Sequence, residues 1–255
     1  MSGKDDTDRI CRNIAKMSSE GAGIVVVHGG GPEINAALEK EGITPKKVNG
    51  LRITDDATLE VVEKTLRAIN EGMVSSLTEA GAKAIGMPGY LVTQCKKKEP
   101  VITDDGPVDL MYVGDVVSAD VESLEDLIKS GVIPVIFPVG ADAEGNHLNI
   151  NADSMASGVA AALKCSEMVQ LTDVPGIMID VKDPSSKKDV LTLGEVDALI
   201  ENGTITGGMI PKVEACRKAL DAGVEKVRMF NGKDKNIELS DIVKGSDEGT
   251  VITKG

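Results

Sequence analysis

The sequence predicts an α/β protein whose mainly parallel sheet is covered by helices on both faces. Short apolar runs rich in β-branched residues alternate with segments in which apolar residues recur at helical spacing. The runs are typical of buried parallel strands, and their alternation with amphipathic helices favours crossover connections. The 255 residues, 41% of them apolar, suffice for one large domain or for two lobes on a continuous sheet. Aromatic residues make up only 2%, so the core must be aliphatic.

The predicted strands are the short apolar runs that end in glycine, proline or polar turns. They cover residues 24–27, 84–87, 133–137, 168–171 and 226–230. The predicted helices share an apolar stripe among charged residues, and several begin near a proline, aspartate or serine. They cover residues 5–19, 32–39, 58–80 (as one or two helices), 123–130, 153–163, 193–202 and 211–222.

Residues 90–120 interrupt this alternation. Two short β-type runs, residues 91–94 and 101–103, lie around polar turns. This pattern predicts a β-hairpin excursion from the main sheet. Neither a repeat of 20–50 residues nor a low-complexity linker divides the chain. We therefore expect a single domain over residues 1–255.

The composition narrows the possible partners and the cellular compartment. A formal charge of −13 repels nucleic acid and anionic membranes, which argues against both as partners. The four cysteines, Cys11, Cys95, Cys165 and Cys216, form no CxxC pair, which argues against a zinc or redox motif and suits a reducing cytoplasm. No apolar run approaches the roughly 18 residues of a membrane span, and the polar N-terminal segment does not resemble a signal peptide. No protein-bound metal is expected.

In open parallel sheets, ligands bind beyond the carboxyl ends of the strands. Four loops that follow predicted strands or open predicted helices therefore hold the candidate site residues: residues 28–31, 149–153, 172–176 and 207–212. In the first loop, Gly29, Gly30 and Gly31 lie between a strand and a helix. Because glycine lacks a Cβ, their N–H groups can approach a phosphate closely, although tight turns use the same residues. Neither a Walker A loop nor a GxGxxG fingerprint is present.

Other candidates have two readings from the residues alone. Asn149 and Asn151 would point the same way on an extended segment and could hold an anion, while Asp153 is either functional or a helix N-cap. Arg52 could bind a carboxylate through two hydrogen bonds or lie solvated on the surface. Lys212 could meet phosphate charge at a helix start or be an ordinary surface lysine. We interpret His28 as a structural residue or hydrogen-bond donor rather than a general base.

Together these segments resemble the amino acid kinase family, and within it the members that phosphorylate N-acetyl-L-glutamate. The matching segments occur in the family's order and span almost the whole chain. They are VVVHGGGPEIN (25–35), NGLRITDDATLEVVE (49–63), DLMYVGDVVS (109–118), SGVIPVIFPVG (130–140), NINAD (149–153), LTDVPGI (171–177) and GGMIPKVEA (207–215).

The resemblance implies a three-layer αβα sandwich with an acyl-acceptor lobe, approximately residues 1–163, and a nucleotide lobe, approximately residues 164–255. It implies ATP-dependent phosphorylation of the side-chain carboxylate of N-acetyl-L-glutamate, in arginine biosynthesis, with Mg²⁺ arriving on ATP. Roles implied for single residues follow the motifs. Gly30 and Gly31 would donate to the transferring phosphoryl group or acceptor carboxylate, and Arg52 and Asn149 would hold the acceptor, with Asn151 nearby. Asp153 would organise catalytic lysines, Lys212 would neutralise phosphate charge, and Thr172, Asp173, Gly208 and Met209 would lie in the nucleotide site.

One departure from the family pattern bears on activity. Family members begin with a strand of the type K-[IL]-G-G-S, and Lys4 lies in a polar stretch that does not match it. Either the true start lies upstream of Met1, which we favour because the sheet would otherwise lose a central strand, or the chain is a short non-catalytic binding or regulatory member.

Two further expectations follow from the resemblance. A kinase for carrier-protein-bound aminoadipate or glutamate, from lysine or arginine synthesis, is the nearest alternative in the same chemistry. The resemblance also implies a homodimer without arginine feedback.

Overall fold

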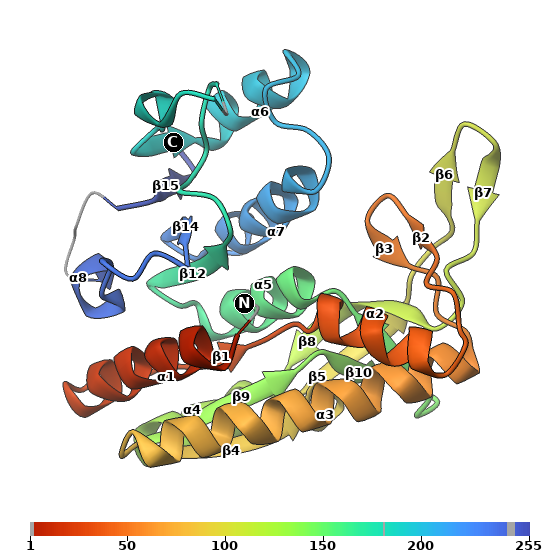
Figure 1. Cartoon of the computed structure of the whole chain (residues 1–255), viewed down its shortest axis with the longest axis horizontal. Helices are drawn as coiled ribbons and strands as arrows, with labels where there is room; N and C mark the ends of the chain where they lie inside the picture. Colours follow the sequence, from red (N-terminus) through yellow and green to blue (C-terminus); the bar gives the residue numbers. More distant parts are fainter. Residues whose placement is uncertain (1–2, 181, 244–247) are drawn as a thin grey trace. The chain divides into compact units, whose positions relative to one another are not determined.

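The computed structural model describes residues 3–180, 182–243 and 248–255. Figure 1 shows the chain as a cartoon. Its contacts divide it into two compact units: residues 23–159, here called the central unit, and residues 1–22 with 160–255, here called the split unit. The first 22 residues therefore group with the C-terminal third of the chain.

The central unit contains eleven strands among its described residues. They are β1 (Val26–Val27), β2 (Lys47–Val48), β3 (Leu51–Arg52), β4 (Lys83–Pro88), β5 (Thr93–Lys97), β6 (Val101–Thr103), β7 (Gly106–Val108), β8 (Val113–Ala119), β9 (Val132–Phe137), β10 (Val139–Ala141) and β11 (His147–Ile150). Its helices are α2 (Gly31–Lys40), α3 (Asp56–Glu79), the single turn η1 (Gly89–Leu91) and α4 (Val121–Lys129), and α5 (Ala152–Leu163) begins in it.

A parallel sheet in the order β1-β9-β4 positions the glycine loop. In the middle strand, Val135 lies opposite both Val26 of β1 and Gly86 of β4. All three strands run in the same direction, so their carboxyl ends share one edge, where residues 28–31 follow β1. Helix α3 lies along β4 and β9 (Figure 1). The predicted α/β class with parallel pairing is confirmed.

A second sheet, in the order β10-β11-β8-β5, holds most of the predicted excursion. β5 and β8 pair antiparallel, and β6 and β7 form a hairpin between them, as residues 90–120 predicted. However, β8 also pairs in parallel with β11, which places Val113 opposite Asn149. The excursion therefore supports the strand that carries Asn149.

The structure contains a β2–β3 hairpin that was not predicted from the sequence. Lys47 pairs with Arg52 and Val48 with Leu51 across a two-residue loop. Both loop residues, Asn49 and Gly50, have positive φ (48° and 81°). An Asn-Gly pair is the strongest short signal for such a turn, so the hairpin could have been predicted from the sequence.

The split unit is built on a sheet in the order β12-β14-β15-β13. Its elements are α1 (Lys4–Ser19), β12 (Glu167–Thr172), η2 (Pro184–Ser186), β13 (Val190–Thr192), α6 (Leu193–Glu201), α7 (Met209–Asp221), β14 (Lys226–Asn231), α8 (Leu239–Val243) and β15 (Thr250–Thr253). β14 and β15 pair antiparallel, while β12–β14 and β13–β15 pair in parallel.

Helix α1 is tied to the C-terminal residues by polar contacts. The backbone N–H of Leu239 donates to Asn13 Oδ1 at 2.8 Å, and Arg9 Nη2 donates to the carbonyl of Gly232 at 2.5 Å. Asn13 is buried, so this bond offsets the cost of removing its amide from water. The helix itself was predicted, but its partner was not.

The structure bears on two expectations drawn from the composition, which concern the cysteines and membrane spans. All four cysteines are free thiols, three of them buried. Among the helices of the described chain, none has the length and apolarity needed to cross a bilayer.

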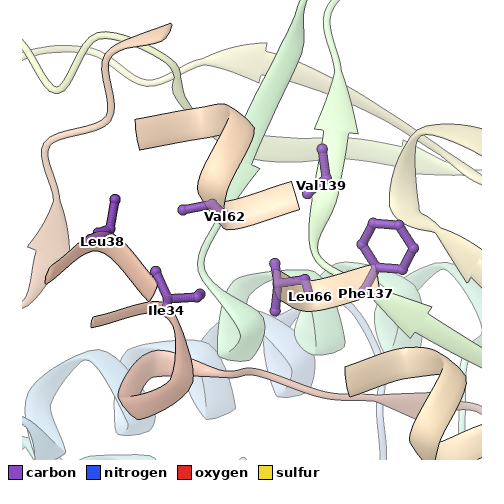
Figure 2. Close-up of a cluster of buried hydrophobic side chains, with 6 residues drawn as sticks. All are labelled: Ile34, Leu38, Val62, Leu66, Phe137 and Val139. Carbon is purple, nitrogen blue, oxygen red and sulfur yellow. The ribbon is translucent and has the colours of Figure 1, made fainter. Parts of the chain in front are cut away.

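A buried aliphatic cluster anchors α2 on α3. Figure 2 shows its six side chains facing one another: Ile34 and Leu38 from α2, Val62 and Leu66 from α3, and Phe137 and Val139 from the β9–β10 segment. Because α2 begins at the glycine loop, this packing fixes where the loop can lie.

We expect Leu66→Ala to lower the free energy of unfolding by about 2–5 kcal/mol, because it leaves a cavity where the side chain is 1% exposed. Leu91→Ala is the matched control, since Leu91 is 64% exposed. Urea unfolding of both variants tests the prediction. Equal losses would show that the cluster does not stabilise the unit.

Candidate functional site

The glycine loop leads from β1 directly into α2. The backbone N–H of His28 still donates to the carbonyl of Ile136, and Gly30 is the N-cap of α2. Pro32 lies in the first turn, as its fixed φ allows. A Cβ on Gly30 would lie 2.5 Å from Ile69 Cδ1, so a side chain at this position would displace the loop or its neighbour.

A second helix start lies beside this loop. A Cβ on Gly29 would lie 3.4 Å from the Cβ of Ala152, the first residue of α5. Asn151 precedes the helix, and its Oδ1 accepts the N–H of Ser154 at 3.1 Å. Asn151 therefore caps α5, and Asp153, considered above as an N-cap, lies within the first turn. Two helix N-termini close together favour an anion, because their N–H groups and dipoles carry partial positive charge.

Arg52 is a buried cation, contrary to the surface reading left open by the sequence. Its side chain is 8% exposed, and Nη2 donates to Asn35 Oδ1 at 2.6 Å. Burial lowers the pKa of Arg52. Nη1 is buried with no hydrogen-bond partner among the described residues. A covered N–H without an acceptor is costly, so this guanidinium suits a planar anion that small side-chain shifts would admit.

Asn149 is connected to Arg52 through Thr54. The amide Nδ2 of Asn149 donates to Thr54 Oγ1 at 3.0 Å, and Thr54 Oγ1 donates to the carbonyl of Arg52 at 2.9 Å. Backbone bonds between Thr54, Tyr112 and Asn149 continue the link. Thr54 is fully buried. The structure thus brings together Arg52 and Asn149, which are far apart in the sequence.

In the split unit, Thr172 is the last residue of β12 and Asp173 follows the strand. The Thr172 hydroxyl lies 2.8 Å from the carbonyl of Val174 and 3.2 Å from that of Phe230. Its side chain therefore shapes the loop, whereas Asp173 is exposed. The backbone N–H of Gly232 donates to the carbonyl of Thr172, which joins this loop to the end of β14.

The start of α7 carries the other candidates of the split unit. Gly208 is its N-cap, Met209 its first residue and Lys212 its fourth. The first turn holds no acidic residue. A lysine at a helix N-terminus opposes the helix dipole, so this arrangement gains stability when an anion binds.

Three polar residues that structure this site were not chosen from the sequence: Asn35, which is half-buried, and Thr54 and Asn70, which are buried. Asn35 and Thr54 lie inside the family-like segments 25–35 and 49–63. Asn70 had its own signal, because it interrupts the buried stripe of α3 that includes Leu66 and Met73. A polar residue in such a stripe requires a partner in the core.

His28 is that partner. Its Nε2 lies 3.0 Å from Asn70 Nδ2, and its Nδ1 lies 3.0 Å from the carbonyl oxygen of Gly29. Burial lowers the pKa of His28, and the bond to Gly29 opposes this only in part. The neutral imidazole is therefore favoured, in agreement with a hydrogen-bonding rather than an acid–base role.

This shift predicts a pH-dependent contribution of His28 to stability. Above the ordinary pKa of 6.5, the group is neutral in both states and its contribution is complete. Below 6.5 the unfolded chain takes up the proton first, so the free energy of unfolding of the wild type falls with pH. In urea unfolding between about pH 7.5 and 5.5, the wild type should lose more stability than His28→Asn. Parallel pH curves would contradict the shift.

The comparisons with known proteins agree on one family. The model of the amino acid kinase family matches residues 1–231. An acetylglutamate kinase of Methanococcus maripaludis is 43% identical over 251 residues, which are 96% of this chain and 85% of that protein. One from Methanocaldococcus jannaschii is 42% identical over 250 residues, 95% of this chain and 83% of that protein.

Solved structures agree on the fold. The crystal structure of smu.665 from Streptococcus mutans has a TM-score of 0.80 at 28% identity, over 96% of this chain and 92% of that one. A carbamate kinase from Giardia has a TM-score of 0.72 at 18% identity, over 99% of this chain and 91% of that one.

Proposed function

This chain belongs to the amino acid kinase family, and we propose that it transfers the γ-phosphoryl group of ATP to the side-chain carboxylate of N-acetyl-L-glutamate. The chain is a phosphotransferase with a carboxyl group as acceptor, and the reaction belongs to arginine biosynthesis. The single observation that carries the acceptor assignment is the buried guanidinium of Arg52, whose Nη1 has no hydrogen-bond partner in the part of the chain that the structure describes.

The acceptor is held by the central unit in this proposal. Arg52 binds the α-carboxylate, and Asn149 binds the amide. Asn35 supports this assignment because it holds Nη2 and leaves Nη1 for the ligand. Thr54 accepts from the amide of Asn149, and Asn35 accepts from the guanidinium of Arg52, so neither side chain has to be ordered by the substrate alone. Thr54 also donates to the backbone carbonyl of Arg52 and thereby links the two residues.

The glycine loop receives the transferring group. Gly30 is the N-cap of α2 and Gly31 its first residue, and Ala152 begins α5 beside Gly29. Both helix starts favour the negative charge that accumulates when a carboxylate attacks a phosphate. Asn151 caps α5 and thereby orders this second helix start.

The nucleotide is held by the split unit. Met209, Gly208 and the loop around Thr172 and Asp173 bind ATP, and Lys212 balances charge on its phosphates. Asp153, in the first turn of α5 in the central unit, is the other residue proposed to act in catalysis. Phosphoryl transfer depends mainly on positioning and charge stabilisation, so a lysine at a helix start suits the role. Mg²⁺ arrives with ATP and supplies further positive charge when bound.

Two broader properties belong to the same proposal. The enzyme acts in the cytoplasm, which the four free thiols support. It works as a homodimer, to be tested by light scattering of the purified protein.

Hydroxylamine trapping of acyl phosphate tests the reaction. The purified chain is incubated with ATP, Mg²⁺ and either N-acetyl-L-glutamate, L-glutamate or aminoadipate. N-acetyl-L-glutamate should give the highest kcat/KM, because only it presents both the carboxylate and the acetyl amide. If none of the three compounds gives acyl phosphate, the kinase assignment is wrong. A preference for aminoadipate would overturn the acceptor.

A further inference from the structure

Asn70 carries a polar amide into the core of the central unit. The residue is 3% exposed and lies in the apolar stripe of α3. Its Nδ2 donates to the carbonyl of Val135 at 2.9 Å and lies 3.0 Å from His28 Nε2. Val135 belongs to the middle strand, β9, and His28 follows the neighbouring strand, β1. One side chain therefore connects a helix to two strands.

These contacts determine the tautomer of His28. A carbonyl oxygen can only accept, so the atom of Asn70 that faces Val135 must be the amide nitrogen. The same nitrogen then donates its second hydrogen to His28 Nε2, which must carry no proton. The proton of the neutral ring is therefore on Nδ1, and Nδ1–H donates to the carbonyl of Gly29.

This bond fixes the orientation of one peptide group in the glycine loop. In a trans peptide the C=O and the following N–H point in roughly opposite directions. Holding the carbonyl of Gly29 toward His28 directs the N–H of Gly30 away from the imidazole. Gly30 is the N-cap of α2, where N–H groups are not used by the helix.

The absence of a side chain at Gly86 of β4 is an independent observation that space is kept for the Asn70 amide between α3 and the sheet. A Cβ on Gly86 would lie 2.0 Å from Asn70 Oδ1, closer than any real contact. The bare backbone at Gly86 leaves room for the amide.

We propose that His28 and Asn70 are positioning residues that lock the Gly29–Gly30 peptide so that the N–H of Gly30 faces the transferring phosphoryl group. The proposal rests on the function proposed above for the glycine loop. Neither residue touches substrate. Each acts through the peptide that it holds, and this distinguishes them from Arg52 and Lys212.

Two substitutions at His28 separate the two contacts. Asparagine places its amide nitrogen near the position of Nδ1, so His28→Asn keeps the donor to Gly29 and loses the acceptor for Asn70. Glutamine places its amide near Nε2, so His28→Gln keeps the contact with Asn70 and loses the donor to Gly29. We expect kcat to fall about 10²-fold in His28→Gln and less than about ten-fold in His28→Asn, with the KM for N-acetyl-L-glutamate little changed in both. Equal kcat values, or an order that follows the free energy of unfolding, would overturn the proposal.

Nitrogen NMR tests, without relying on activity, whether His28 and Asn70 hold the Gly29–Gly30 peptide. The ¹⁵N shifts of the His28 ring in the wild type should show a protonated Nδ1 and an unprotonated Nε2. The amide resonance of Gly30 should move more in His28→Gln than in His28→Asn. A protonated Nε2, or equal Gly30 shifts, would overturn the inference. If the wild type makes no acyl phosphate but the NMR results are as expected, the proposed reaction is wrong, whereas the positioning of the Gly29–Gly30 peptide by His28 and Asn70 is still supported.

Discussion

Replacing Arg52 with alanine is expected to lower kcat/KM for N-acetyl-L-glutamate by about 10²-fold, mostly through a higher KM. Removing one partner of a buried charge pair costs about 2–5 kcal/mol, because the other charge is left unpaired. The α-carboxylate does not react, so Arg52 should bind ground state and transition state alike, and such uniform binding appears in KM rather than in kcat. Steady-state kinetics with varied acceptor measures the effect.

The hairpin offers a matched control for this prediction. Lys47 lies opposite Arg52 in the β2–β3 register, carries the same charge and is exposed. Lys47→Ala should leave KM nearly unchanged, which separates a specific contact from a general loss of positive charge. Arg52→Lys should recover only part of the affinity, because an ammonium cannot contact Asn35 and a carboxylate in one plane. A fall in kcat at constant KM would argue against a carboxylate-binding role.

Replacing Lys212 with alanine is expected to lower kcat by about 10²–10³-fold, corresponding to roughly 2.7–4 kcal/mol of transition-state stabilisation. The KM for ATP should change much less, since Lys212 is expected to act most strongly on charge that develops during transfer. The acyl-phosphate assay at saturating substrates measures kcat directly.

Lys218 is the control for Lys212. It lies on the same helix, α7, in the last turn, and is exposed. Lys218→Ala changes the net charge equally but leaves the helix start intact, so its kcat should stay near that of the wild type. Thermal unfolding of both variants excludes a folding defect. An unchanged kcat in Lys212→Ala would remove this residue from the mechanism.

Local patterns were sufficient for most helices and central strands. The apolar spacing in residues 5–19 and 58–80 predicts α1 and α3, and the run 133–137 predicts β9, because burial of one face imposes a period that any such segment must follow. Shorter elements were missed for a different reason. The β2–β3 hairpin and β15 are too short for periodicity, although Asn49-Gly50 is itself a turn signal.

The sequence by itself determined the α/β class, the loops at the carboxyl ends of the strands and the residue types that those loops present. Only the tertiary structure decided which of these residues have partners. It buried Arg52 beside Asn35, linked Asn149 to Thr54, made Asn151 the cap of α5, and paired His28 with Asn70. His28 and Asn70 are 42 residues apart, so no local period relates them. Their contact depends on how β1, α3 and β9 pack together, and the cost of burying an unpaired polar group then selects the one arrangement that satisfies both.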